Sequence, residues 1–440
     1  MLLRLPPLKK AALLICAAFF FYGCSRGQDL PDISNFTART RHTTIAFGTL
    51  SVLRLYDDFT RTANVARFER VWDGTREILR ELDSVFSSSR PDSDVSRFNA
   101  LPYGESIAIS VHMARVIRKA GELHEKTDGL FDPTVFPLVD LWGFTPRFRA
   151  ARFTPFFPYD RPFGRNQLPA NEYIEAFTRL VDFSSVILEG CEASGFTLTK
   201  MIPPVIVNGV TYQAKLDFGA IAKGYAADLV RELMITEGFH FGLFSCGGSS
   251  IALLNGMDYV SIEDRVFHFA VELRKPRPGQ NHGTTFIRVM TGNTNLSTSG
   301  DYDNAFFVDG IRYSHIFDPR TGQPINTPSP RAPFYGAQNG IVAATVFGGT
   351  GAFAEGLSTG LLVMTLTEAI SFINRLENVK VVLVYYKTGS EYLEIITNIP
   401  AEHINILDSA YVMASRLDAF GNIEYTGILY RGTDIPVQSL

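Results

Sequence analysis

Apolar residues recur at helical spacing in several stretches of the chain, and each of these stretches predicts a helix. In residues 68–86, Val71, Ile78, Leu82 and Phe86 fall seven or four positions apart, which is typical of one buried helix face. Further helices are predicted over residues 110–126, with Ser110 as a candidate N-cap, and over 171–180, 222–237 and 352–376.

Alternating or continuous apolar runs predict strands. The clearest runs cover residues 43–56, 205–216, 241–253 and 379–386, and the last of these has the continuous apolar character of a buried strand. Residues 255–345 alternate short strands and turns, whereas 145–170 are rich in Pro, Phe and Arg and predict an irregular excursion. Because strands and helices mix without regular βαβ alternation, the pattern favours an α+β fold.

The N-terminus has the pattern of a targeting segment. Basic residues precede an apolar run of about twelve residues, which suits the core of a signal peptide and is short for a membrane span. The run ends at Gly23-Cys24, which resembles a bacterial lipobox in which Cys24 becomes the acylated first residue. An uncleaved anchor helix, or an ordinary signal peptide with an incidental Cys, would leave the same pattern.

The lipobox interpretation divides the chain into residues 1–23 as a lipoprotein signal peptide, 24–40 as a polar tether and 41–440 as the folded domain. It implies a lipid-anchored protein on the periplasmic side of a bacterial membrane, with the inner membrane preferred.

Composition and charge limit the classes of partner that this protein can bind. The chain has 440 residues, of which 46% are hydrophobic and 20% are charged, which is an ordinary globular composition with ample material for a core. Removing residues 1–23 deletes three basic and no acidic residues, which leaves 38 basic against 45 acidic residues and a net charge of −7. This balance argues against nucleic acid as a partner. An anionic ligand would need local dipoles, a metal or a few placed cations.

Cysteines give no metal motif. Cys16 leaves with the signal peptide and Cys24 is the candidate for acylation, so Cys191 and Cys246 remain. These two could pair in an oxidising periplasm, although their spacing alone does not bring them together. No Cys/His spacing indicates zinc.

Two segments in the first half carry candidate chemistry. After the helix over 110–126, Gly129 is a helix stop and Asp132 sits in a turn with a carboxylate that is either a ligand contact or a simple cap. Trp142 is either a stacking platform or a core residue, and taken alone the core interpretation is preferred.

A stronger signal covers residues 216–228. A strand ends at Asp217, small residues follow, and a helix begins that carries Lys223. Small residues let a ligand approach the backbone, helix N-terminal amides favour an anion, and the Lys supplies a point charge. The spacing is not that of a P-loop. The alternative is a tight strand-to-helix connection with a surface Lys.

Three later segments complete the set. In residues 299–324, His315 lies three residues from Asp318 among turn residues, which indicates either proton handling or a polar hairpin with a solvated His. Gly247-Gly248 marks a close backbone approach or a bulge. Glu355 and Thr359 share a helix face and offer oxygen ligands of the kind Mg²⁺ uses, unless Thr359 bonds back to its own helix.

Taken in chain order, these segments resemble the ApbE family of flavin transferases over residues 43–366. The matching pieces are residues 47–49, 93–99, 127–135 with 141–144, 217–228, 247–248, 297–302, 314–324 and 355–360. The resemblance implies an ApbE-like, T-fold-like α+β catalytic domain over residues 41–440, in which mixed sheet and helix form a single large two-lobed unit.

The resemblance also implies a reaction. FAD, the substrate, is split at its pyrophosphate, AMP leaves, and FMN is joined by a phosphoester to a Thr or Ser of a target protein, with Mg²⁺ required. The acceptors implied are periplasm-facing redox proteins. A lipoprotein signal fits, since many members are periplasmic lipoproteins.

Site residues follow from the same resemblance. His315 is the implied activator of the acceptor hydroxyl, with Asp318 and Asp301 as orienting or ligand-contacting groups, and Asn99 sits where the family tunes water against protein as acceptor. The implied metal ligands are the backbone oxygen of Ala220 and the side chains of Glu355, Ser358 and Thr359. The implied FAD contacts are Phe47, Leu130, Phe131, Asp132, Asp217, Lys223, Asp301 and Phe317, the last through its backbone.

Two positions depart from the family pattern. Glu355 stands where the family usually has Asp, and its extra methylene would shift the metal or make it bind through water. Phe47 replaces a usual Met. An FAD pyrophosphatase, a flavin-binding lipoprotein with weakened catalysis and a structural lipoprotein without ligand are therefore the alternative functions.

Overall fold

The structure is a computed structural model that describes residues 32–145, 168–261, 264, 266–276, 285–308, 311–327, 340–386, 393–408, 410–417 and 424–430. The chain divides into two units, Met1–Asn35 and Phe36–Leu440, and the elements below belong to the second. The predictions for residues 1–23, for Cys24 and for most of 145–170 lie outside the described residues. Within the described part, no helix is both long and apolar enough to cross a membrane.

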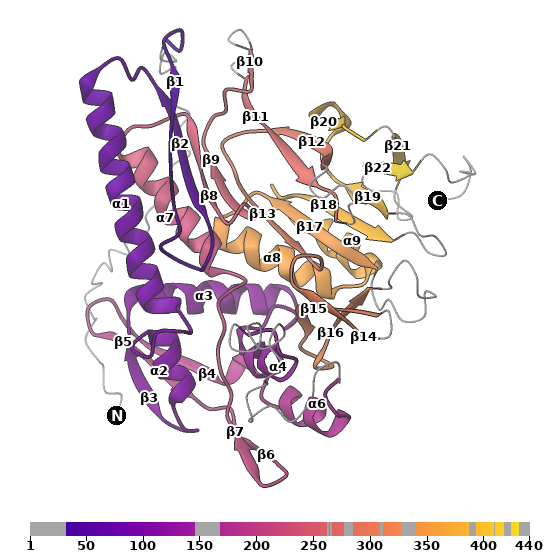
Figure 1. Ribbon diagram of the computed structural model, residues 1–440. Helices are drawn as coiled ribbons and strands as arrows, with labels where there is room; N and C mark the ends of the chain where they lie inside the picture. Colours follow the sequence, from indigo (N-terminus) through magenta and orange to yellow (C-terminus); the bar gives the residue numbers. More distant parts are fainter. Residues whose placement is uncertain are drawn as a thin grey trace, which may run out of the picture. The chain divides into compact units, whose positions relative to one another are not determined.

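The largest sheet in the described chain has ten strands, and every neighbouring pair is antiparallel (Figure 1). In spatial order the strands are β1 (Thr37–Thr43), β2 (Ser51–Asp57), β8 (Gly242–Cys246), β9 (Ser250–Leu253), β13 (Asn295–Gly300), β17 (Ile341–Phe347), β18 (Lys380–Tyr386), β19 (Leu393–Thr397), β22 (Glu424–Tyr430) and β21 (Tyr411–Leu417).

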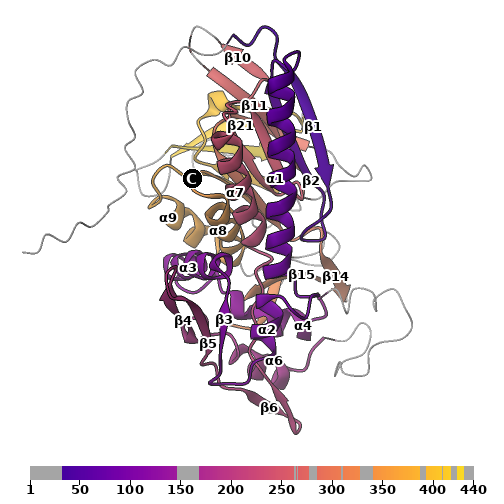
Figure 2. The same ribbon diagram turned by 90° about the vertical axis from the view of Figure 1, so that its left-hand side faces the viewer.

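Both faces of this sheet are covered. Helices α1 (Thr62–Phe86), α7 (Ala222–Thr236) and α8 (Gly351–Val363) pack together along one face (Figures 1 and 2). The other face packs against a second sheet, and a separate hydrophobic core lies between the two sheets. In spatial order the strands of this second sheet are β10 (Tyr259–Ser261), β11 (Val266–Arg274), β12 (Thr285–Thr291) and β20 (Ile404–Ile406).

Strand β18 shows why its sequence is apolar without alternation. Val381 and Leu383 belong to the core under the helices, whereas Val382 and Val384 belong to the core under the second sheet. Because successive side chains of a strand point to opposite faces, a strand buried on both faces reads as a continuous apolar run. The predicted buried strand over 379–386 is thereby confirmed.

The remaining elements of the described chain are shorter, apart from α3, and lie outside the two sheets just described. They are α2 (Asp94–Ala100), β3 (Ser106–Ile109), α3 (Val111–Lys126), η1 (Pro133–Val135), α4 (Phe136–Leu141), α6 (Asn171–Thr178), η2 (Phe183–Ser185), β4 (Val186–Cys191), β5 (Gly195–Lys200), β6 (Val205–Val207), β7 (Val210–Tyr212), β14 (Ala305–Val308), β15 (Ile311–Asp318), β16 (Gln323–Thr327), α9 (Leu366–Ile373) and η3 (Ala401–His403). Strands β3, β5 and β4 form one small sheet and β14, β15 and β16 another.

Most predicted helices are confirmed, and so is the α+β class. Helices α1, α3, α6 and α7 lie where the apolar spacing placed them, although α1 begins six residues earlier. Ser110 caps α3, because its hydroxyl accepts a hydrogen bond from Met113 N at 3.2 Å.

Three strand predictions were wrong in the same way, since each run contains the turn of a hairpin and is not one continuous strand. Residues 43–56 contain the turn between β1 and β2, where Phe47 and Gly48 have φ of 57° and 61°. Residues 241–253 turn at Gly247 and Gly248, both with φ of 70°. Two consecutive left-handed residues reverse a strand tightly, so the Gly pair is a hairpin turn rather than a bulge. Residues 205–216 likewise form β6 and β7.

The predicted helix over 352–376 was also wrong, because it is two helices. Helix α8 ends at Val363 and α9 begins at Leu366. Thr365 and Glu368 form a capping box: Glu368 N donates to the Thr365 hydroxyl at 3.2 Å and Thr365 N donates to the Glu368 carboxylate at 2.7 Å. Apolar residues continue across the break, so periodicity alone does not reveal it.

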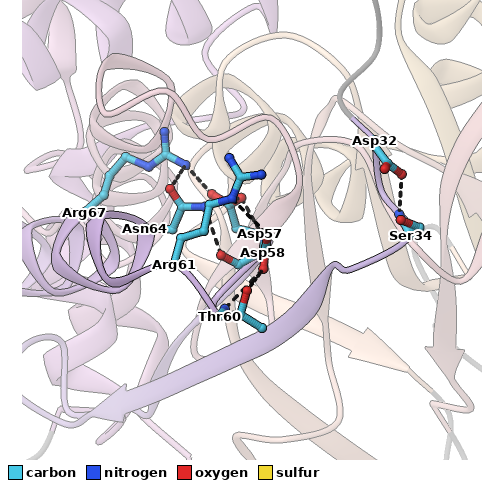
Figure 3. Close-up of polar contacts among 8 residues, drawn as sticks. All are labelled: Asp32, Ser34, Asp57, Asp58, Thr60, Arg61, Asn64 and Arg67. Carbon is cyan, nitrogen blue, oxygen red and sulfur yellow. Dashed lines mark hydrogen bonds and ion pairs between the residues drawn. The ribbon is translucent and has the colours of Figure 1, made fainter.

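A polar cluster ties the end of β2 to the start of α1 (Figure 3). The Asp57 carboxylate pairs with Arg67 and accepts hydrogen bonds from Asn64 Nδ2 at 3.1 Å and from Asp58 N at 2.8 Å. Charge-assisted bonds of this kind fix the angle at which the chain leaves the sheet. They thereby position α1, on which α7 packs.

Candidate active site

Helices α7 and α8 touch backbone to backbone at two glycines. A Cβ placed on Gly224 would lie 2.1 Å from Gly351 O, and one on Gly351 would lie 2.4 Å from Gly224 O. The Asp228 carboxylate strengthens the contact, since it accepts hydrogen bonds from Gly351 N at 2.5 Å and Ala352 N at 3.1 Å. Only glycine permits this approach, which brings the first turn of α7 against the side of α8.

The approach joins two predicted site residues directly. The Glu355 carboxylate forms an ion pair with Lys223 through Oε1 and accepts a hydrogen bond from Gly224 N at 2.7 Å through Oε2. Glu355 is only 3% exposed, whereas Lys223 is half-buried. Burial lowers the pKa of Lys223, but the adjacent Glu355 carboxylate outweighs it and the net shift is upward. Lys223 is therefore held as an ammonium.

The turn before α7 is held from two sides. The Asn99 side chain accepts from Leu216 N at 2.7 Å and donates to Leu216 O at 3.0 Å, and Asp217 N donates to Pro133 O at 2.9 Å. Asp217 Oδ1 accepts from Gly219 N at 2.8 Å, and Lys223 Nζ donates to Gly219 O at 2.7 Å. Burial raises the pKa of Asp217 against the opposing effects of this hydrogen bond and of Lys223. Asn99 thus positions the segment that carries Asp217.

The segment 130–132 lies beside α8. Phe131 is buried, and a Cβ on Gly356 of α8 would meet its ring at 3.2 Å. The Asp132 carboxylate caps η1 by accepting from Thr134 N at 2.7 Å, and it also accepts from Phe183 N at 3.2 Å. The capping interpretation of Asp132 is confirmed, and the flavin contact of Leu130, Phe131 and Asp132 stays a prediction. So does that of Phe47, which packs partly buried on the main core.

Three hydroxyls gather where β13 meets α8. Ser299 Oγ lies 2.7 Å from Ser358 Oγ and 3.0 Å from Thr359 Oγ1. Ser358 and Thr359 also donate to Glu355 O at 2.9 and 3.2 Å, so the predicted back-bond of Thr359 is present. Ser299 had no role assigned from sequence. Its place in the matching piece 297–302, two residues before Asp301, is the signal that could have drawn attention to it.

His315 lies in an irregular part of β15. Tyr313 pairs with Asn326 and Phe317 with Pro324, so β15 carries extra residues between these pairs. Both the backbone N and the ring Nδ1 of His315 lie 3.1 Å from Asn304 O. A carbonyl oxygen can only accept, so a neutral His315 carries its proton on Nδ1 and its lone pair on Nε2. The bulge aims the side chain, as bulges near active sites commonly do.

The other predicted residues of this region have structural partners. Asp318 is buried and binds the Arg320 guanidinium through both oxygens, with Nη2–Oδ2 at 2.8 Å. Asp301 is fully buried at the end of β13, and its backbone N donates to Val342 O at 3.1 Å. Phe317 packs beside Trp142, which is 1% exposed and stacks on Tyr313. The core interpretation of Trp142 is confirmed, and the roles of Asp301, Asp318 and Phe317 stay predictions.

The donor chemistry near Glu355 suits a hard divalent cation. Within the described chain no group of three or more His, Cys, Asp or Glu side chains could hold a metal ion. Mg²⁺ does not need such a group, because it binds through one or two carboxylates with waters and substrate phosphates. Glu355 supplies a carboxylate, and Ser358 and Thr359 supply hydroxyls one turn further along α8. Ala220, in the turn just before α7, supplies a backbone oxygen. The set fits Mg²⁺, with the Glu355 carboxylate already shared by Lys223.

The two remaining cysteines are both free. Cys191 is exposed and Cys246 is buried. Burial raises the pKa of the Cys246 thiol to about 11, so it stays protonated near neutral pH.

Solved structures place this fold among the flavin transferases. The crystal structure of the flavinyl transferase ApbE of Pseudomonas stutzeri, apo form, matches with a TM-score of 0.59 and 27% identity over 80% of this chain and 92% of that chain. The flavin transferase ApbE of Vibrio cholerae matches with a TM-score of 0.59 and 26% identity over 81% and 97%. The family model of the ApbE family covers residues 47–383, and the chain belongs to that family.

Curated relatives agree with this assignment. An FAD:protein FMN transferase of Vibrio cholerae serotype O1 is 33% identical over 287 residues, which is 65% of this chain and 71% of the relative. One of Escherichia coli K12 is 27% identical over 366 residues, which is 82% and 88%. The resemblance seen in the short motifs is confirmed.

Proposed function

We propose that this protein is an FAD:protein FMN transferase that uses Mg²⁺. It splits the pyrophosphate of FAD, releases AMP and joins FMN by a phosphoester to a Thr or Ser of a periplasm-facing redox protein. The observation that carries the proposal is the junction of α7 and α8, where Lys223 and Glu355 meet beside a turn of small residues.

The α7 junction offers what a pyrophosphate requires. Residues 219–221 form the turn that leads into α7, whose first amides point toward its N-terminus, and Lys223 adds a full positive charge there. Helix N-termini and a placed Lys are recurrent partners of phosphate groups. They supply local positive charge on a chain whose net charge is negative.

Metal ligands would come from the same junction. Glu355, Ser358, Thr359 and the backbone oxygen of Ala220 would hold Mg²⁺, with Glu355 as the one carboxylate. A bound Mg²⁺ supplies charge neutralisation for the pyrophosphate oxygens and the leaving phosphate. In the absence of acceptor, water could take the place of the hydroxyl, which would give FAD pyrophosphatase activity.

His315 would handle the proton. The acceptor hydroxyl oxygen forms a bond to the phosphorus of the FMN half of FAD, and the bond from that phosphorus to the bridging oxygen breaks. AMP leaves with the electron pair, and the hydroxyl proton passes to Nε2 of His315. The Asn304 carbonyl supports this role, because it holds Nδ1–H and stabilises the imidazolium that forms.

The location remains part of the proposal. Residues 1–23 would be a lipoprotein signal peptide, Cys24 the lipidated residue, 24–40 a tether and 41–440 the catalytic domain. The anchor would hold the enzyme on the periplasmic side of the inner membrane, within reach of membrane redox proteins.

The test is to incubate the purified protein with FAD, Mg²⁺ and an acceptor protein and to examine a denaturing gel for flavin fluorescence. We expect fluorescence that migrates with the acceptor and disappears when EDTA replaces Mg²⁺. Free FMN and AMP without labelled acceptor would instead establish the pyrophosphatase. FAD that stays intact would support a flavin-binding protein with weakened catalysis.

A further inference from the structure

Both oxygens of the Glu355 carboxylate are occupied by groups of α7. Oε1 is paired with the Lys223 ammonium and Oε2 accepts from Gly224 N at 2.7 Å. A divalent cation that binds through this carboxylate therefore meets a positive charge already in place. Two cations at one carboxylate oxygen repel each other strongly when the oxygen is buried.

We propose that Lys223 and the divalent cation are alternative partners of Glu355, so that metal binding releases the Lys223 ammonium toward the Gly219–Lys223 turn and the anionic ligand there. The proposal deepens the proposed function and rests on it for the identity of the ligand, the FAD pyrophosphate. Lys223 is thus a positioning switch that couples metal binding to phosphate binding.

Lys223 has other polar partners that it can keep after it leaves Glu355. Its ammonium already donates to Gly219 O at 2.7 Å, and it attracts the nearby Asp217 carboxylate. Leaving Glu355 therefore keeps one strong hydrogen bond and one favourable charge. The lysine side chain is a flexible stem with a point charge, so rotation about its bonds can move the ammonium without moving α7.

Glu355 itself is held by the backbone. Because Gly224 N donates to Oε2 and the glycine pair fixes Gly224 against α8, the carboxylate stays in place when Lys223 leaves. The longer reach of Glu relative to Asp is what brings the carboxylate to α7. The exchange is thereby a property of this chain's own residues.

The first test uses the unaltered protein and needs neither FAD nor acceptor. Lysine amines are labelled with trace acetic anhydride, with and without Mg²⁺, and the rate at Lys223 is measured by mass spectrometry relative to Lys126, an exposed residue of α3. We expect Mg²⁺ to raise the acetylation rate of Lys223 about tenfold, because the loss of one charge-assisted hydrogen bond corresponds to about this factor. An unchanged or lower rate overturns the proposal.

The second test measures metal affinity. Mn²⁺ binding to the apoprotein is followed by the loss of the free-ion electron paramagnetic resonance signal. We expect Lys223→Met to bind Mn²⁺ about tenfold more tightly than the parent, and Lys126→Met, which removes one exposed charge, to bind like the parent. In a Glu355→Gln background, Lys223→Met should give no gain.

Weaker or unchanged Mn²⁺ binding in Lys223→Met, or the same gain in the Glu355→Gln background, contradicts the exchange. Because both tests omit FAD and acceptor, they separate the two proposals. A protein that shows the exchange but transfers no flavin refutes the transferase function alone. A protein that transfers flavin without the exchange refutes the switch alone.

Discussion

Replacing Gly224 by Ala should push α7 away from α8. It should thereby separate the part of the site on α7, which carries Lys223, from the part on α8, which carries Glu355. The new Cβ would lie 2.1 Å from Gly351 O, whereas ordinary contact begins at 3.4 Å, so the backbones must separate by about 1.3 Å. The neighbours are backbone atoms that cannot rotate away. Overpacking of this kind costs about 1–3 kcal/mol of stability. A displacement near 1 Å at reacting groups lowers turnover roughly a hundredfold.

The assay pairs urea denaturation with the initial rate of flavin transfer to an acceptor. Two matched glycines give a graded series. At Gly356 a Cβ would lie 2.3 Å from the end of the Leu123 side chain. Because that side chain can rotate, Gly356→Ala should lose less stability and less activity than Gly224→Ala. At Gly121 the nearest atom is 3.9 Å away, so Gly121→Ala should keep full activity and gain up to about 1 kcal/mol. A Gly224→Ala protein as active as Gly121→Ala would refute the close-approach argument.

Four further outcomes follow from the described contacts. Lys223→Met leaves the buried Glu355 carboxylate without its cation and should lower the free energy of unfolding by about 3 kcal/mol, with part restored by Mg²⁺; equal stability with and without Mg²⁺ would contradict this. Glu355→Asp shortens the reach to Lys223 and should raise both Mn²⁺ affinity and transfer rate; lower values of both would count against the metal assignment. Burial lowers the pKa of Lys200 to about 8, with Lys215 adding to the effect. Between pH 8 and 10.5, Lys200 therefore holds more protons in the unfolded protein than in the folded protein. The free energy of unfolding, measured in urea, should rise over this range by about 1–3 kcal/mol relative to Lys200→Met. The same pH dependence in both proteins would contradict this. His315→Ala should lower the transfer rate about a hundredfold while FAD affinity stays constant, and a loss of FAD affinity alone would reassign His315 to binding.

The sequence predicted most of the helices because their signals are local, and it predicted the family because several short motifs follow one another along the chain. Apolar spacing and the Ser110 cap lie within one turn of the residues they specify. The hairpins were missed because an apolar run does not show where two left-handed residues reverse it, as Phe47 and Gly48 do. The break between α8 and α9 was missed because apolar residues continue across Met364.

Within the site, pairs distant in sequence escaped prediction. Nothing local links Glu355 to Lys223, or Asn99 to Leu216, since both contacts depend on the packing of helices and turns. Glu355 stood out from sequence only as a departure from Asp. The structure gives that departure a physical consequence, because the longer side chain reaches an ammonium and a backbone amide on α7.

The most direct test of the transferase function is a stoichiometric measurement. The protein is incubated with FAD, Mg²⁺ and excess acceptor, and mass spectrometry of the intact acceptor is combined with chromatography of the free nucleotides. We predict that one AMP is released for each acceptor molecule that gains the mass of FMN less one water, the increment of a phosphoester, with the modification on a Thr or Ser. Release of AMP and free FMN in equal amounts while the acceptor keeps its mass would contradict the account.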